Sequence, residues 1–122
     1  MKLNRNFLSG VLCGGVLVGG LSFYFQPSGA AENAAKVVLE NDRVRVREVR
    51  FEPGVKPGMH THPYAHVGVI LDDGTLQFND PGGKSEKVEF KSGAVAWRDA
   101  KVTHEAVNVG QSPLRVIEVE IK

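Results

Sequence analysis

All four histidines of the chain fall into two short segments. His60, His62 and His66 lie close together, and His104 follows in a separate segment further along the chain. Neutral imidazole nitrogens are common ligands of divalent transition metals. Because alternate residues of an extended strand point to one face, the rings of His60 and His62 could grip the same ion. The pattern predicts a metal site whose ligands are His60, His62, His66 and His104.

A site built from imidazoles alone has a restricted chemistry. Isolated histidines are more often surface or core residues than ligands, but this grouping favours a metal. Structural zinc sites usually recruit cysteine, and the chain has a single one, Cys13, so an intramolecular disulfide is also excluded. An octahedral ion held by four nitrogens keeps two adjacent positions open for water, dioxygen or a bidentate substrate. We therefore expect a centre that small molecules can reach.

Other side chains near these segments are weaker candidates. Tyr64 lies between two predicted ligands and could act as a catalytic residue by donating a hydrogen bond to a bound oxygen species; packing in the interior is the alternative. Phe78 and Trp97 fit core positions, with the lining of a substrate pocket as the alternative. Glu105 directly follows His104, so strand alternation points its carboxylate away from the metal.

Length and charge limit the kind of protein. The 122 residues leave room for one domain, and the 42% of hydrophobic residues suffice for a packed core. The formal net charge is +1, and basic residues are interleaved with acidic ones. No basic patch or acidic tail stands out, so the sequence does not predict a nucleic-acid partner.

Residues 1–30 form a separate segment. Lys2 and Arg5 precede an uncharged apolar stretch, residues 7–25, and small residues follow. This order is typical of a cleaved signal peptide, but the length of the stretch also fits an uncleaved N-terminal membrane anchor. In both cases the positive charges keep the start of the chain inside the cell. We expect a periplasmic or secreted domain, residues 36–122, with membrane contact only through residues 7–25 if they are uncleaved.

The rest of the chain predicts an all-β fold. Its runs alternate with a period of two residues, and no helical period is convincing. Turn signals such as Asp72-Asp73-Gly74 separate these runs at the spacing of a sandwich or barrel. The expected strands cover residues 37–40, 43–47, 65–71, 75–79, 84–90, 94–98, 102–109 and 114–120.

Two of these strands carry an expected orientation. In residues 43–47 arginines alternate with valines, and we expect the valines inside and the arginines on a solvated face, with a dimer contact as the alternative. The alternation slips at Glu48, because Val49 and Phe51 take the other parity, and this predicts a bulge or a bend. In the last strand apolar residues alternate with acidic ones. One face carries Ile117, Val119 and Ile121, and the other carries Glu118 and Glu120.

The two histidine segments resemble the two motifs of a known family, in order and at a short separation. The run Gly54-x5-His60-x-His62-x3-His66 resembles the first motif of the cupins, G-x5-H-x-H-x3 or x4-E-x6-G. The segment Gly93-x5-Asp99-x-Lys101-x2-His104-x3-Asn108 is similar to their second motif, G-x5-P-x-G-x2-H-x3-N. The resemblance covers residues 54–108 and implies a small jelly-roll β-barrel with a metal near its interior.

The chain departs from the cupin pattern in both motifs. His66 stands where the family has its glutamate ligand, which makes the chain similar to the small four-histidine cupins. The glycine that ends the first motif comes one residue late, at Gly74. Asp99 and Lys101 replace the proline and glycine of the second motif, so the turn before His104 could differ.

The resemblance also implies a cofactor and partners. It favours manganese or iron as the divalent metal ion, whereas imidazole donors and filling of the site outside the cytoplasm favour copper or zinc. The sequence leaves this choice open. The resemblance further implies a small-molecule substrate or ligand, and a homodimer formed through exposed strand edges.

Our leading hypothesis for function is an extracytoplasmic metal-binding cupin that acts as a dioxygenase-type oxidoreductase on a small organic molecule. One alternative is a non-catalytic module that binds a metal or a small molecule, which the absence of an acid–base residue beside the ligands favours. Another is a metal-assisted isomerase or lyase. The fold alone does not choose among them.

Overall fold

A computed structural model describes residues 33–122 of the chain. The expected signal peptide or anchor, residues 1–30, lies outside the described residues and stays a prediction. Between residues 33 and 122 there is no helix long and apolar enough to cross a membrane.

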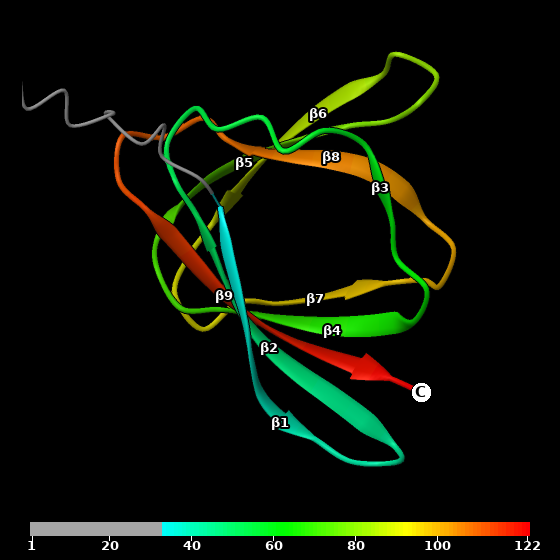
Figure 1. Cartoon of the computed structure of the whole chain (residues 1–122). Helices are drawn as coiled ribbons and strands as arrows, with labels where there is room; N and C mark the ends of the chain where they lie inside the picture. The colour runs from blue at the N-terminus through cyan, green and yellow to red at the C-terminus, as the bar shows by residue number, and fades with distance from the viewer. Residues whose placement is uncertain (1–32) are drawn as a thin grey trace, which may run out of the picture. The chain divides into compact units, whose positions relative to one another are not determined.

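The described part of the chain consists of strands and connecting turns, with no helix (Figure 1). The all-β prediction is confirmed. The structure has nine strands between residues 33 and 122 where eight ranges were expected, and the additional strand is the short β3. Their bounds are β1 Ala34–Glu40, β2 Val44–Phe51, β3 His60–Thr61, β4 Ala65–Ile70, β5 Gly74–Asn79, β6 Ser85–Phe90, β7 Val95–Arg98, β8 Thr103–Asn108 and β9 Leu114–Ile121.

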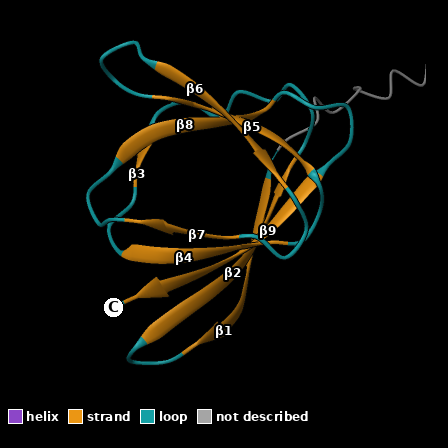
Figure 2. Cartoon of the chain, turned by 180° about the vertical axis from the view of Figure 1, so that it is seen from behind, coloured by secondary structure: helices purple, strands orange, loops and turns teal. Residues whose placement is uncertain are grey.

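The strands form two sheets that face each other across the interior. One sheet has the order β1-β2-β9-β4-β7, and the other has the order β3-β8-β5-β6. From β3 onward the chain passes repeatedly from one sheet to the other, and the strand pairings within the sheets are antiparallel (Figure 2). This is a small jelly-roll barrel, as expected from the motifs.

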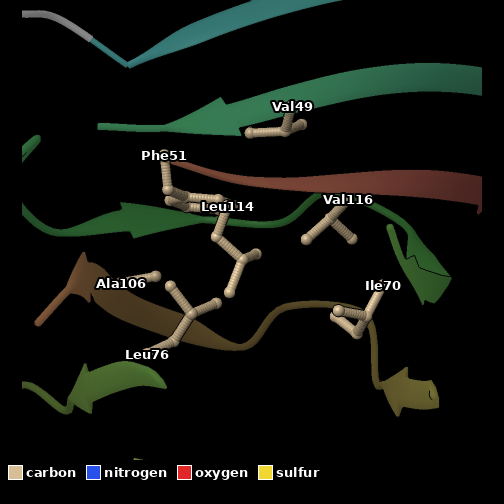
Figure 3. Close-up of a cluster of buried hydrophobic side chains, with 7 residues drawn as sticks. All are labelled: Val49, Phe51, Ile70, Leu76, Ala106, Leu114 and Val116. Carbon is tan, nitrogen blue, oxygen red and sulfur yellow. The ribbon is translucent and has the colours of Figure 1, made fainter. Parts of the chain in front are cut away.

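Apolar side chains from both sheets fill one end of the interior (Figure 3). Leu114 is fully buried at the centre of this cluster. Val116, two residues further along β9, is buried on the same face. Towards the other end of the barrel the inward-facing side chains become polar. The core cluster consists of Val49, Phe51, Ile70, Leu76, Ala106, Leu114 and Val116.

The expected orientation of β2 is wrong. Arg45 and Arg47 lie directly opposite Glu120 and Glu118 of β9, on the same face as the buried Val49. The pairing of β2 with β9 runs without a register shift, so β2 has no bulge at Glu48; the irregularity lies instead in β1, between Val37 and Leu39. The valines of residues 43–47 therefore face outward, and the two arginines face the interior.

The orientation of β9 explains why arginine is tolerated inside. Glu118 and Glu120 are buried, with exposed fractions of 7% and 1%, whereas Ile117 and Val119 on the other face are half-buried. Glu120 forms ion pairs with both inward arginines, and Glu118 pairs with Arg47. A buried carboxylate is stable only when it is paired and hydrogen-bonded, and guanidinium groups satisfy this need. Charge pairing across β2 and β9 thus replaces apolar packing at this end.

Candidate metal centre

The pairing of β3 with β8 brings two of the predicted ligands together. His60 lies directly opposite His104 in the register of these strands. His62 follows just after β3, and two backbone hydrogen bonds hold its position: its N–H donates to the Val102 carbonyl at 3.0 Å, and the Lys101 N–H donates to its carbonyl at 2.8 Å. The turn that precedes β8 therefore fixes the third ligand against the other two.

The Nε2 atoms of these three histidines converge. His62 Nε2 lies 3.2 Å from His60 Nε2 and 3.0 Å from His104 Nε2. Two nitrogens bound to one ion at about 2.1 Å and at right angles would lie about 3.0 Å apart. The observed separations fit neighbouring ligands of one ion. His60, His62 and His104 form a group that could hold a metal, with ring nitrogens all within 4.8 Å of one another.

Burial prepares two of these rings to bind a cation. His62 and His104 are 5% and 7% exposed. Desolvation, followed by the charges of His66 and the other histidines, lowers the pKa of His62 to about 3. Desolvation, followed by the charge of Arg98, lowers the pKa of His104 to about 4. Both rings are therefore neutral at pH 7, with lone pairs available to a metal.

The second nitrogen of a ligand histidine usually donates to an acceptor that orients the ring. His60 has such an acceptor, because its Nδ1 lies 3.3 Å from the Gly58 carbonyl oxygen. The buried Nδ1 atoms of His104 and His66 have no hydrogen-bond partner within residues 33–122. His60 is thus the ring whose tautomer the backbone fixes, with Nε2 left to face the cluster.

His66 lies beside the three-histidine group but is not part of it. It is a buried residue of β4, in the opposite sheet, and its ring centroid is 4.4 Å from that of His62. The histidines whose ring nitrogens lie close to one another are the other three, His60, His62 and His104. The role of His66 as a fourth ligand stays a prediction.

Tyr64 takes a different place from the predicted ligands. The guanidinium of Arg45 lies 5.8 Å from the centroid of its half-buried ring. Tyr64 is not among the residues that line the cavity next to the histidines. The proposed hydrogen bond from its hydroxyl to a bound oxygen species stays a prediction.

A cavity of about 70 Å³ lies between the two sheets, next to the histidines. Since a water molecule needs roughly 10–15 Å³ of such space, the cavity can hold several waters or one small molecule. Gly68 and Ala96 carry little or no side chain here, which keeps the space open. Phe78 and Trp97 both line the cavity. Phe78 also packs against the core cluster, as expected, whereas Trp97 is 57% exposed and is not a core residue.

The cavity wall also contains two charged residues that the sequence did not predict there, Glu118 and Arg98. Glu118 shares its parity with the core residues Leu114 and Val116, and this is the signal that could have placed it inside. Arg98 is the last residue of β7 and lies opposite His66 in the register. The cavity therefore contains a carboxylate and a guanidinium besides the imidazoles.

The turn before His104 keeps the backbone that the second motif requires. Lys101 stands at the motif's glycine position and has a φ of 67°, in the left-handed region that glycine adopts freely. Asn108, which ends the motif, is 1% exposed; its amide donates to the carbonyls of Phe51 and Ser112, and its oxygen accepts the Gly110 N–H. Lys101 therefore adopts a conformation that glycine adopts more readily, at a cost in backbone strain.

Comparison with known proteins places the fold in a family. A family model described as the cupin domain matches residues 47–120. The chain is 35% identical over 95 residues to the beta-alanine degradation protein BauB of Pseudomonas aeruginosa, which covers 78% of this chain and 99% of that protein.

Two solved structures extend the comparison. A cupin domain from Bordetella pertussis Tohama I superposes with a TM-score of 0.69 at 32% identity, over 74% of this chain and 93% of that one. A predicted oxalate decarboxylase from Thermotoga maritima gives a TM-score of 0.58 at 26% identity, over 75% and 81% of the two chains. Together with the two motifs and the jelly-roll topology, these matches show that the chain belongs to the cupin family.

Proposed function

We propose that this cupin is a metal-dependent oxidoreductase of the dioxygenase type that acts on a small organic molecule. His60, His62 and His104 would hold the ion, with His66 as the fourth ligand. The observation that carries the proposal is the convergence of three Nε2 atoms beside a cavity between the two sheets. A bound ion of this kind supplies Lewis acidity and, if it is redox-active, electrons for reaction with dioxygen.

The residues around the ligands support this chemistry in distinct ways. Burial keeps His62 and His104 neutral, so they can bind a cation without first losing a proton. The apolar wall of the cavity, which includes Ile70 and Leu76, limits the water around a bound substrate. Glu118 brings a carboxylate into the same space, held at 2.5 Å by the Arg47 guanidinium.

The identity of the metal and the location of the protein belong to the same proposal. Imidazole donors suit iron, copper and zinc, and the resemblance to four-histidine cupins adds manganese. Residues 1–30 support an extracytoplasmic domain, where a redox-active ion would be acquired after export. The names of two relatives, which concern beta-alanine degradation and a predicted oxalate decarboxylase, support a small polar organic substrate.

A metal-assisted isomerase or lyase is the second candidate, and Glu118 favours it. Such a reaction needs a group that takes up and returns a proton, and this carboxylate lines the cavity. It also weakens the argument for a non-catalytic module, which rested on the lack of an acid–base residue.

The test begins with the metal content of protein purified from its native compartment. The chain loaded with that metal is then given a panel of phenols, thiols, diketones and small organic acids, while dioxygen and substrate are followed together. We expect substrate-dependent oxygen uptake that His104→Gln abolishes together with metal binding. Turnover without oxygen uptake would support the isomerase or lyase, and absence of turnover with a fully loaded site would support the non-catalytic module.

A further inference from the structure

Arg98 places a cation at the edge of the cavity. It ends β7 on the inward-facing register position opposite His66, and its side chain is half-buried. It lines the cavity beside the histidines and also a second hollow, formed with β6 and with the turn between β5 and β6. Its side chain thus lies next to the cavity and to the predicted metal ligand His104, which lines both hollows.

An aromatic stack holds this guanidinium in place. The Cζ atom of Arg98 lies 4.7 Å from the centroid of the Phe78 ring, a distance typical of a cation–π contact. The Phe78 ring in turn lies 5.4 Å from the ring of His104. Phe78 therefore connects the guanidinium to the metal-binding group, and the two lie in one defined arrangement.

Arg98 differs from the other inward or partly buried arginines in its partners. Arg45, Arg47 and Arg115 each form an ion pair with a carboxylate, as does the exposed Arg50. Within residues 33–122, Arg98 forms none. The carboxylate that shares its cavity, Glu118, is held by Arg47. A guanidinium has five N–H donors in a planar fork, which matches the two oxygens of a carboxylate.

We propose that Arg98 is a specificity-determining residue that binds the carboxylate of a small anionic substrate next to the metal. This inference rests on the proposed function, because the same cavity holds the substrate. The cavity volume of about 70 Å³ admits an organic acid of a few heavy atoms and not a nucleotide or a sugar phosphate. A charge-assisted hydrogen bond to a guanidinium typically contributes about ten- to a hundredfold in affinity.

The experiment measures binding, so it does not depend on catalysis. The full chain is loaded with Zn²⁺, which has no redox chemistry, and titrated at pH 7 with acetate, malonate, their neutral amides and inorganic phosphate. Isothermal titration calorimetry gives the affinities, and the fluorescence of the single tryptophan, Trp97, which lines the cavity, reports the same event. We expect the carboxylates to bind about tenfold or more tightly than their amides.

Three variants locate this preference. Arg98→Met keeps the apolar stem and should lower the preference for carboxylate over amide about tenfold or more, while Zn²⁺ affinity and the β-sheet circular dichroism stay as in the wild type. Arg98→Lys keeps the positive charge but loses the planar pair of N–H donors. It should therefore retain only part of the preference for carboxylate over amide. Arg50→Met removes an equal charge from a surface pair with Glu52, and it should leave carboxylate binding unchanged.

The outcomes separate the two proposals. Carboxylate binding that is unchanged in Arg98→Met, that falls equally in Arg50→Met, or that is weaker than phosphate binding would overturn the role of Arg98. Failure of the wild type to bind Zn²⁺ would count against the metal centre instead. If carboxylates then still bound in an Arg98-dependent manner, the assignment of Arg98 would stand without the metal.

Discussion

The two buried histidines make the stability of the metal-free domain depend on pH in a predictable direction. Their pKa values are about 3 for His62 and about 4 for His104, below the ordinary value of 6.5. In the unfolded chain both rings are exposed and take up a proton near pH 6.5, whereas in the folded chain they stay neutral. The unfolded state therefore binds more protons below pH 6.5, and the free energy of unfolding must fall as the pH falls.

The size of the effect follows from the same values. Each pH unit between 6.5 and the folded pKa reduces the free energy of unfolding by about 1.4 kcal/mol for each histidine. At pH 5 the loss is about 2 kcal/mol per ring, or about 4 kcal/mol for His62 and His104 together. A domain of this size has a total of about 5–15 kcal/mol, so the loss is large. Carboxylates, with ordinary pKa values of about 4, contribute little between pH 7 and pH 5.

Urea unfolding followed by circular dichroism, in a chelating buffer at pH 7, 6 and 5, measures this loss. The matched control is the double variant His62→Gln with His104→Gln, which has no titrating group at either position and should show a much flatter profile. A wild-type loss below about 1 kcal/mol between pH 7 and pH 5 would refute the reasoning. A loss of equal size in the double variant would show that it arises from other groups.

Three further substitutions test how the barrel supports the site, each by urea unfolding. Lys101→Gly relieves a left-handed residue and should raise the free energy of unfolding by about 1 kcal/mol; a decrease would contradict the assigned φ. Gly74→Ala would bring a Cβ to 2.8 Å from Cδ1 of the buried Leu114, so it should destabilise the domain by about 1–3 kcal/mol. Glu120→Gln weakens a buried ion-pair network and should cost about 3 kcal/mol, whereas Glu89→Gln, in an exposed pair, should have no measurable effect. Equal effects of these last two would mean that burial of the network is unimportant.

The strands and the cluster of histidines were predictable because local spacing determines them. Alternation with a period of two and turns such as Asp72-Asp73-Gly74 identify strands without knowledge of their partners. The pair His60 and His62 shares a face for the same reason. The two motifs then predicted that His104 would lie beside them, and the pairing of β3 with β8 places it directly opposite His60.

The orientation of β2 and β9 was not predictable from either strand alone. Alternation separates two faces of a strand, but it does not say which face is inside when one carries valine and the other arginine. The decision depends on the partner strand, because Arg45 meets Glu120 across the pair and their charges compensate each other in the interior. Each strand considered singly favours the apolar face as the inner one; the two considered together permit the charged face there.

His104 and His66 approach the other histidines in different ways, one through strand pairing and the other across the interior. Parity correctly predicted that His66 faces inward, but parity carries no information about which sheet a strand joins. His60 and His104 belong to paired strands, where residues directly opposite lie about 5 Å apart, so their rings meet as a consequence of the backbone. His66 comes from β4 in the other sheet, and facing sheets lie about 10 Å apart. Its contact with His62 depends on side chains that reach across the interior, which only the packing of the whole barrel determines.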